Sequence, residues 1–281
     1  MTNVSLSKTN FIFQNKLDLK ELIKLLYLKD IKKLVKLFEY NVDSENINLF
    51  ILEFSKLGGF LHMKIDEFLF KNLDYINNYV NNVLLIRFYQ FSNNTITIGK
   101  LQKIDQEIIN KNRNYLIVRR ITGGKAVYHL PKKDLTFSVI GNTIIFRKIN
   151  FNKENILNFI HQFFNKTVKD TLTSLNIKLY NKLDNLIIEG NNRKIDENLK
   201  KFDCFANPMS FELTYNNQKI VGSAIKIANN KFILQANIKL YLVNNSLANP
   251  DFINKFIEKF YINFYENLNN NFNLLYLNLR S

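Results

Sequence analysis

Two residues of this chain, Cys204 and Lys219, have the types needed for covalent catalysis and stand close together in the sequence. A cysteine reacts as its thiolate, and a nearby ammonium group lowers the pKa of the thiol electrostatically. Lys219 follows the only cysteine by 15 positions (219 − 204), after an expected turn at Asn216-Asn217. If that turn joins two antiparallel strands, the two side chains can meet. Alone, the cysteine would be read as a buried small hydrophobe and the lysine as a solvated charge.

A second informative segment is RRITGGKAVYH, which runs from Arg119 to His129. The two arginines end an apolar strand that begins at Tyr115, and Gly123-Gly124 predicts a tight turn. Glycine lets backbone N–H groups approach a ligand in conformations closed to other residues. The apolar run LTFSVIG follows, so we expect a ligand-binding loop between two strands.

These segments resemble the LipM-type octanoyltransferases of the biotin/lipoate A/B protein ligase superfamily, whose shared unit is the BPL/LPL catalytic domain. The pattern C-F-x-x-P-x-x-F-E-L begins at Cys204, and K-I-V-G-S-A begins at Lys219. The strand pair IRFYQFSNNTITIGKLQ (86–102) and the helix HMKIDEFLF (62–70) are similar too. The resemblance covers roughly residues 48–245.

The resemblance implies an α+β fold, with a mixed β-sheet flanked by helices, and an acyltransferase of lipoate biosynthesis and protein lipoylation. Cys204 would take octanoate from octanoyl-acyl carrier protein as a thioester intermediate, with Lys219 as the active-site lysine. The acyl group would pass to a lipoyl domain, either the glycine cleavage H protein or a dehydrogenase E2 subunit. No metal or nucleotide cofactor is implied. The implied substrate-binding residues are Arg119, Arg120, Thr122, Gly123, Gly124, Lys125, His129, Gly222, Ser223 and Ala224.

Several positions depart from the family pattern. Lys125 stands where the family usually has arginine, which keeps the charge. LPKKD after His129 replaces the Asp and Gly-Asn elements of the ATP-dependent ligases. Ala236-Asn237 stands where the transferases have His-Gly, so we expect Asn237 to narrow the acyl pocket or to displace its strand.

The composition favours a soluble enzyme of ordinary domain size. The 281 residues are 46% hydrophobic and contain one cysteine, which excludes an internal disulfide. No segment offers the roughly 18 uncharged apolar residues of a membrane helix, and no signal peptide is recognisable. We expect a cytoplasmic protein without a membrane partner. The net charge of +15 comes from scattered lysines, with no basic stripe that would predict nucleic-acid binding.

The chain divides into an expected N-terminal helical extension, residues 1–47, and a catalytic domain, residues 48–281. Asp18 and Asp30 are expected to cap two amphipathic helices of the extension. A meander with turns at Asn216-Asn217 and Asn229-Asn230 precedes a final helix, 251–268, that carries phenylalanines at four-residue spacing. Strands and helices mix without regular alternation, which favours α+β.

Other functions remain open from the residues alone. They are an ATP-dependent lipoate or biotin ligase, a lipoyl or octanoyl amidotransferase that uses the same cysteine, and a non-catalytic binding relative. His62 and His161 are expected to be packing or surface residues, and Asp66 and Glu67 to be surface or locally paired groups on a helix.

Overall fold

The computed structural model describes residues 16–39, 47–149, 155–177, 180–181, 213–216 and 218–278. Within them, the main sheet has six strands in the order β1-β2-β3-β7-β12-β11. Neighbours β1, β2 and β3 pair in parallel, and the remaining neighbours pair antiparallel. The strands are β1 (Lys16–Leu17), β2 (Asn48–Leu57), β3 (Val83–Phe91), β7 (Leu135–Asn142), β12 (Lys231–Ile238) and β11 (Val221–Ala228). The predicted α+β class with a mixed sheet is confirmed.

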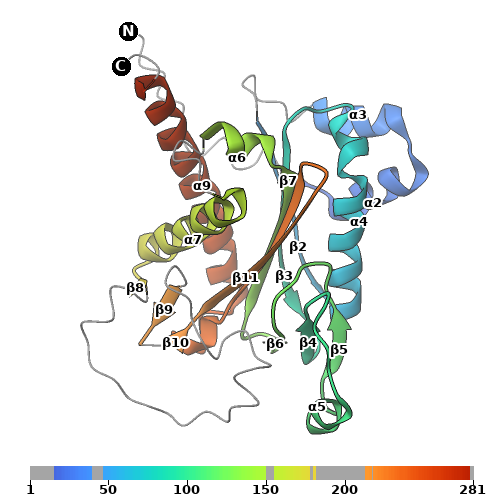
Figure 1. The fold of residues 1–281 in the computed structure, drawn as a ribbon, viewed down its shortest axis with the longest axis vertical. Coiled ribbons are helices and arrows are strands. Elements are labelled where there is room, and N and C mark those ends of the chain that lie inside the picture. Colours follow the sequence, from blue (N-terminus) through green and yellow to red (C-terminus); the bar gives the residue numbers. More distant parts are fainter. Residues whose placement is uncertain are drawn as a thin grey trace.

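Two smaller sheets lie near one end of the main sheet (Figure 1). One places β4 between a parallel and an antiparallel neighbour, and the other is a short antiparallel sheet that leads into β11. The first consists of β5 (Leu116–Arg119), β4 (Thr95–Ile98) and β6 (Val127–His129). The second consists of β10 (Gln218–Lys219), β9 (Leu213–Tyr215) and β8 (Tyr180–Asn181).

Helices cover both faces of the main sheet (Figure 1). One face carries α2, α3 and α4, and the opposite face carries α6, α7 and α9, while α5 lies apart beside β4 and β5. The helices are α2 (Leu19–Leu28), α3 (Ile31–Glu39), α4 (Gly59–Asn77), α5 (Gln106–Lys111), α6 (Ile144–Ile149), α7 (Ile156–Ser174) and α9 (Pro250–Asn278), with a short 3-10 turn, η1 (Leu240–Leu242). Among the described helices, none combines the length and the apolar composition that a membrane-spanning segment needs.

The face of the sheet under α7 and α9 holds the larger apolar core. Phe256, Phe260 and Phe264 of α9 are fully buried, as their four-residue spacing predicts. The Phe260 ring lies 5.2 Å from Phe88 on β3 and 5.4 Å from Phe137 on β7, measured between ring centroids. These aromatic contacts fix α9 across the strands that carry the site on their other face.

The two N-terminal helices form as the sequence predicts. Asp18 caps α2 by accepting hydrogen bonds from the N–H groups of Lys20 and Glu21, and Asp30 accepts one from Lys33 N. Leu22 is fully buried in a cluster with α4 and the strands beneath it. The two-residue strand β1 was not foreseen. The domain boundary at residue 47 stays a prediction.

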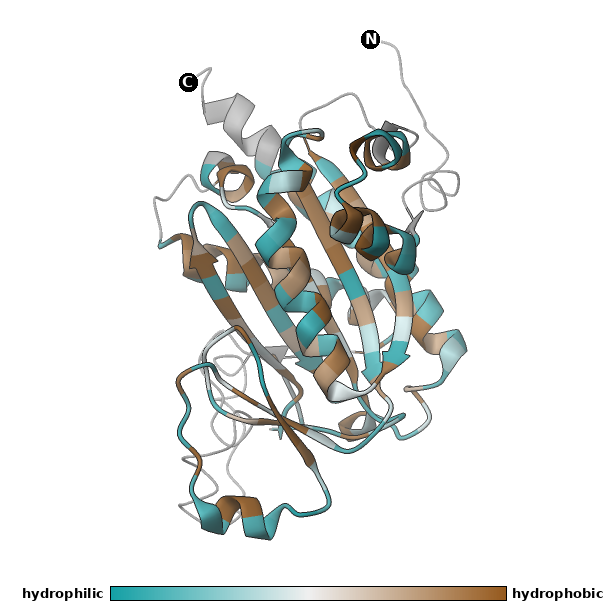
Figure 2. Cartoon of the chain, turned by 90° about the vertical axis from the view of Figure 1, so that its right-hand side faces the viewer, coloured by the Kyte–Doolittle hydropathy of each residue, from teal (hydrophilic) through white to brown (hydrophobic). Residues whose placement is uncertain are grey.

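The alternation of side chains along the strands determines which residues face α4. Successive strand residues point to opposite faces, so residues two apart share one face. On β3, β7 and β12 the positions toward α4 include polar side chains in otherwise apolar strands, and Figure 2 shows these hydrophilic bands within largely hydrophobic strands beneath α4. The site is built from these positions.

Candidate functional site

A buried charge pair joins α4 to the sheet. Asp66 lies within the apolar stripe of α4, and the Asp66 and Arg87 side chains are both 0% exposed. Arg87 Nη1 forms a close ion pair with Asp66 Oδ1. Burial of two charges costs free energy that only good geometry and further hydrogen bonds offset. The expectation that Asp66 is a surface or locally paired residue is therefore wrong.

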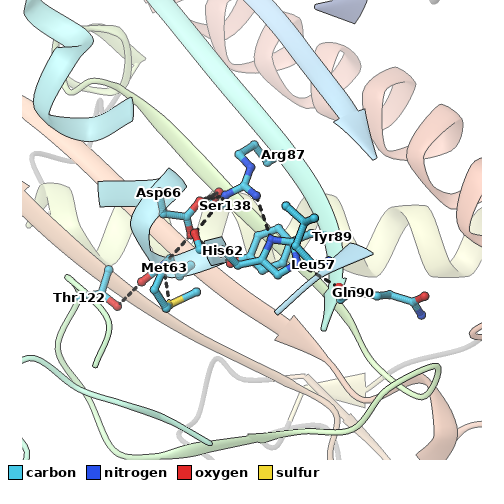
Figure 3. A network of polar contacts seen from close by, with 10 residues as sticks. Leu57, His62, Met63, Asp66, Arg87, Tyr89, Gln90, Thr122 and Ser138 are labelled. Carbon is cyan, nitrogen blue, oxygen red and sulfur yellow. Dashed lines mark hydrogen bonds and ion pairs between the residues drawn. The ribbon is translucent and has the colours of Figure 1, made fainter. Parts of the chain in front are cut away.

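Three further donors complete the shell of Asp66. Ser138 Oγ donates to Oδ1 at 2.8 Å, Tyr89 Oη donates to Oδ2 at 3.0 Å, and Gln235 Nε2 donates to Oδ2 at 2.6 Å (Figure 3). Arg87, Ser138 and Gln235 form one row across the sheet, because each is paired with the next in the strand register. The carboxylate is thus held by side chains from three adjacent strands.

A chain of hydrogen bonds extends from this carboxylate to the Gly-Gly segment. Gln235 turns its Nε2 to Asp66, so its Oε1 accepts from Thr122 Oγ1 at 2.7 Å. The Thr122 oxygen in turn accepts from Arg120 Nε at 3.1 Å. Each group has one orientation that satisfies its neighbours, and the buried network therefore specifies one geometry.

Arg120 and Arg119 shape the loop that the sequence singled out. The buried Arg120 donates to the carbonyl oxygens of Gly123 at 2.5 Å and Lys125 at 2.8 Å. Gly124 has φ +84°, a conformation that favours glycine. Arg119 Nη1 donates to the carbonyl of Gly99 at 2.7 Å and to those of residues 100 and 102. Both arginine side chains therefore donate hydrogen bonds to backbone carbonyl groups of the protein.

A pocket lies beside this loop, between α4, the smaller β4 sheet and strands β7, β11 and β12. Its floor includes a second row across the main sheet, Tyr89, Thr136, Asn237 and Gly222, which are paired in register. The pocket is lined by Met63, Tyr89, Thr97, Arg120, Val127, His129, Thr136, Gly222, Ser223, Ala224, Gln235, Ala236 and Asn237.

The two histidines near the pocket are held neutral. Burial, with a smaller effect of Arg87, lowers the pKa of His62 to about 4. Arg87 has only donors, so His62 Nδ1 accepts from it at 3.1 Å, while His62 Nε2 lies 3.0 Å from the Gln90 carbonyl oxygen and 3.1 Å from Leu57 N. Burial and the nearby Lys239 and Arg120 charges lower the pKa of His129 well below its usual value. His62 is a packing residue, as expected.

Of the two predicted catalytic residues, the described part of the chain includes only Lys219. Lys219 ends β10 and is 4% exposed. Burial, with a smaller effect of the Lys219 charge, lowers the pKa of His161 to about 4. His161 on α7 has its Nδ1 3.0 Å from Ser223 Oγ. Cys204 lies outside the described residues.

The predicted substrate-binding residues divide into two groups. Arg120, His129, Gly222, Ser223 and Ala224 line the pocket. The remaining ones belong to the loop beside it: Arg119, Thr122, Gly123, Gly124 and Lys125. Whether any of them contacts substrate stays a prediction.

Sequence reasoning missed most of the polar network. Asp66, Arg87, Tyr89, Ser138 and Gln235 were not proposed as site residues. A signal was present, since Asp66 interrupts an apolar helical stripe and the strand residues interrupt apolar runs at two-residue spacing. Glu67, the neighbour of Asp66, is locally paired with Lys71 and Lys64 as expected.

Comparisons with known proteins agree on one family. The model of the lipoyl protein ligase A/B catalytic domain matches residues 59–259. Octanoyltransferase LipM of Carboxydothermus hydrogenoformans is 31% identical over 191 residues, which cover 66% of this chain and 61% of that protein. Octanoyltransferase LipM of Clostridioides difficile is 33% identical over 172 residues, covering 59% of this chain and 56% of that one. The chain thus matches about three fifths of the length of these relatives.

Solved structures share the fold. A T. acidophilum protein with bound lipoic acid superposes with a TM-score of 0.51 at 20% identity, covering 80% of this chain and 87% of that one. P. falciparum LipL1 in complex with lipoate superposes with a TM-score of 0.50 at 20% identity, covering 78% of this chain and 63% of that one. At this identity the likeness concerns the architecture of the sheet and its flanking helices.

The buried carboxylate should be far more important for stability than its exposed neighbour. Asp66→Asn leaves the Arg87 charge buried without a counter-charge, so the free energy of unfolding should fall by about 3–5 kcal/mol. The matched control is Glu67→Gln, which removes surface pairs and should cost about 1 kcal/mol or less. Urea denaturation of both variants measures the difference. Equal losses would mean that the Asp66 network does not stabilise the fold.

The neutral state of His62 should make stability depend on pH. Its pKa is lowered from 6.5 to about 4, so below pH 6.5 the unfolded chain binds a proton that the folded chain does not. Stability therefore falls as pH drops from 6.5 toward 4, by about 2 kcal/mol at pH 5 from this group. In His62→Gln the loss of unfolding free energy between pH 7 and pH 5 should be smaller by that amount. Identical losses in the two proteins would contradict the assignment.

Proposed function

Because this chain belongs to the lipoyl protein ligase A/B catalytic domain family, we propose that it is an octanoyltransferase of lipoate biosynthesis. It moves an octanoyl group from octanoyl-acyl carrier protein to a lysine of a lipoyl domain, such as the glycine cleavage H protein. The observation that carries the proposal is the buried Lys219, at the start of the chain segment that forms the pocket wall Gly222-Ser223-Ala224. The names of the curated relatives support the same reaction.

The reaction divides into two transfers through Cys204. In the first, the Cys204 thiolate attacks the thioester carbonyl of the donor, a new C–S bond forms, and the thiol of the carrier protein leaves. In the second, the lysine amine attacks the acyl-Cys204 carbonyl, a C–N bond forms, and the thiolate is released. A covalent intermediate thus replaces one difficult transfer by two easier ones.

Lys219 supplies the positive charge for both transfers. An ammonium group held at low exposure favours the thiolate form of a nearby cysteine. The same charge stabilises the oxyanion that develops at the acyl carbonyl in each transition state. Thr122, Gly123 and Gly124 border the site through the Arg120 and Gln235 hydrogen bonds, which fix the loop before substrate arrives.

The surface charge suits the proposed protein substrates. The chain carries 39 Lys and Arg against 24 Asp and Glu. A net positive protein attracts acidic partners and accelerates their encounter. Carrier proteins and lipoyl domains are acidic as classes, so the charge favours both steps.

Cys204 should be the only residue that becomes acylated. Incubation with octanoyl-acyl carrier protein, without ATP, should add one octanoyl group to the intact mass of the protein. Cys204→Ala should abolish both the adduct and transfer to the H protein while circular dichroism stays unchanged. Transfer that persists in Cys204→Ala would exclude the thioester route, and an adduct that requires ATP would favour a ligase.

Lys219 should accelerate both half-reactions. Lys219→Ala removes the charge that stabilises thiolate and oxyanion, so each single-turnover rate should fall by about 10²–10³-fold, as for one lost oxyanion donor. Lys71→Ala, at an exposed lysine of α4 that pairs with Glu67, is the control and should keep the wild-type rates. A Lys219→Ala enzyme with unaltered rates would remove Lys219 from the mechanism.

A further inference from the structure

The turn that follows β4 presents a leucine to solvent. Leu101 is 88% exposed, the highest value among the large hydrophobic residues that the structure describes. It lies in a closed turn, in which Gln102 N donates to the Gly99 carbonyl at 3.0 Å and Gly99 N donates to Gln102 Oε1 at 3.3 Å. A single exposed leucine is common on protein surfaces. This one differs because the backbone on both sides of it is held in place.

Arg119 holds the backbone of this turn. Its Nη1 donates to the carbonyl oxygens of Gly99 at 2.7 Å, Lys100 at 3.0 Å and Gln102 at 2.9 Å. The planar guanidinium group presents its donors in a fixed geometry, so the turn has one preferred conformation. An apolar side chain on a rigid backbone loses little conformational entropy when a partner covers it. Leu101 is therefore preorganised as an anchor for binding.

The same turn adjoins the Gly-Gly loop beside the pocket. Lys100 N donates to the Thr122 carbonyl at 2.8 Å. A Cβ atom at Gly99 would collide with the Gly124 carbonyl group, so the two segments are in direct contact. Arg120, which lines the pocket, donates its N–H to the Ile98 carbonyl at 3.0 Å. The exposed leucine is thus presented at the rim of the pocket loop.

Lysines flank the exposed leucine. Lys100 and Lys103 are both exposed, and within the described ranges neither forms an ion pair. The acidic residues that follow them are already engaged, because Asp105 caps α5 and Glu107 pairs with Lys111 at 2.7 Å. The turn therefore carries uncompensated positive charge.

A third lysine lies on the other side of the Gly-Gly loop. A Cβ atom at Gly124 would lie 3.7 Å from Ala224 Cβ, and Ala224 lines the pocket. Lys226 is two residues further along β11 and shares the face of Ala224. Its Nζ lies 5.0 Å from the Phe70 ring centroid. Burial lowers the pKa of Lys226 and the Lys100 charge lowers it further, so the two like charges repel one another. An acidic partner would relieve this repulsion.

We propose that Leu101, with Lys100, Lys103 and Lys226 around it, forms the docking surface for the acidic face of the lipoyl domain. This inference rests on the proposed function and adds a binding surface for the protein that accepts the acyl group. Leu101 supplies an apolar anchor that becomes buried in the contact, and the lysines attract and orient the partner. Arg119 serves this surface as a positioning residue.

The place of the surface favours the lipoyl domain over the carrier protein. A lipoyl domain bears the acceptor lysine on its own folded surface, so that surface must approach the pocket to within the length of one side chain. A carrier protein delivers its acyl group on a long flexible arm and can dock further away. A surface in contact with the Gly-Gly loop therefore fits the lipoyl domain.

The test separates docking from chemistry. Enzyme octanoylated by octanoyl-acyl carrier protein is mixed with increasing concentrations of the glycine cleavage H protein, and single-turnover rates of octanoyl-lysine formation are measured. Leu101→Ser should raise the half-saturating concentration of H protein by about 10-fold, the effect of one lost anchor residue. The limiting rate should stay unchanged, because Leu101 contacts no reacting group. Lys103→Gln should raise the half-saturating concentration by about 2-fold to 5-fold and reduce its dependence on salt.

Leu28→Ser is the matched control. Leu28 is 58% exposed at the end of α2, which lies away from α5 and β4 (Figure 1), and its replacement should leave the half-saturating concentration unchanged. An unchanged value in Leu101→Ser, or an equal rise in Leu28→Ser, would overturn the inference while the proposed function stands. Slower acylation by octanoyl-acyl carrier protein in Leu101→Ser, with unaltered transfer to H protein, would also overturn it, because the carrier would then be the docked partner. A wild-type enzyme that transfers no octanoyl group would overturn the proposed function as well.

Discussion

The buried carboxylate of Asp66 is the constraint on which the pocket depends. It reaches the interior on α4, and the four strong donors around it come from three strands of the sheet: Arg87 and Tyr89 from β3, Ser138 from β7 and Gln235 from β12. A charge at 0% exposure is tolerated only because these four groups replace its water. Their positions are consequently fixed relative to α4, and the pocket lies against them.

The two faces of the sheet carry different kinds of side chain. Toward α7 and α9 the strands present apolar side chains, and the contacts of Phe88, Phe137 and Phe260 stabilise the layer without directional demands. Toward α4 the same strands present two polar rows, of which one holds Asp66 and the other forms the pocket floor. The apolar face supplies the stability that lets the polar face carry specific geometry.

Local signals made much of this fold predictable. The Asp18 cap, the phenylalanine stripe of α9 and the turn at Asn229-Asn230, where both residues have positive φ, depend on residues near in sequence. The Asp66 network does not depend on residues near in sequence, because Asp66 and Gln235 are separated by 169 positions. Helical periodicity places Asp66 within the apolar stripe of α4, but only the pairing of distant strands supplies its partners.

The shared carboxylate also has a consequence for the motions of the protein. Local opening of α4, β3, β7 or β12 would expose one donor of Asp66 and leave the others around a poorly solvated charge. Through Gln235 and Thr122, the Gly-Gly loop is tied to the same event. These segments are therefore expected to open as one cooperative unit whose amide hydrogens exchange together.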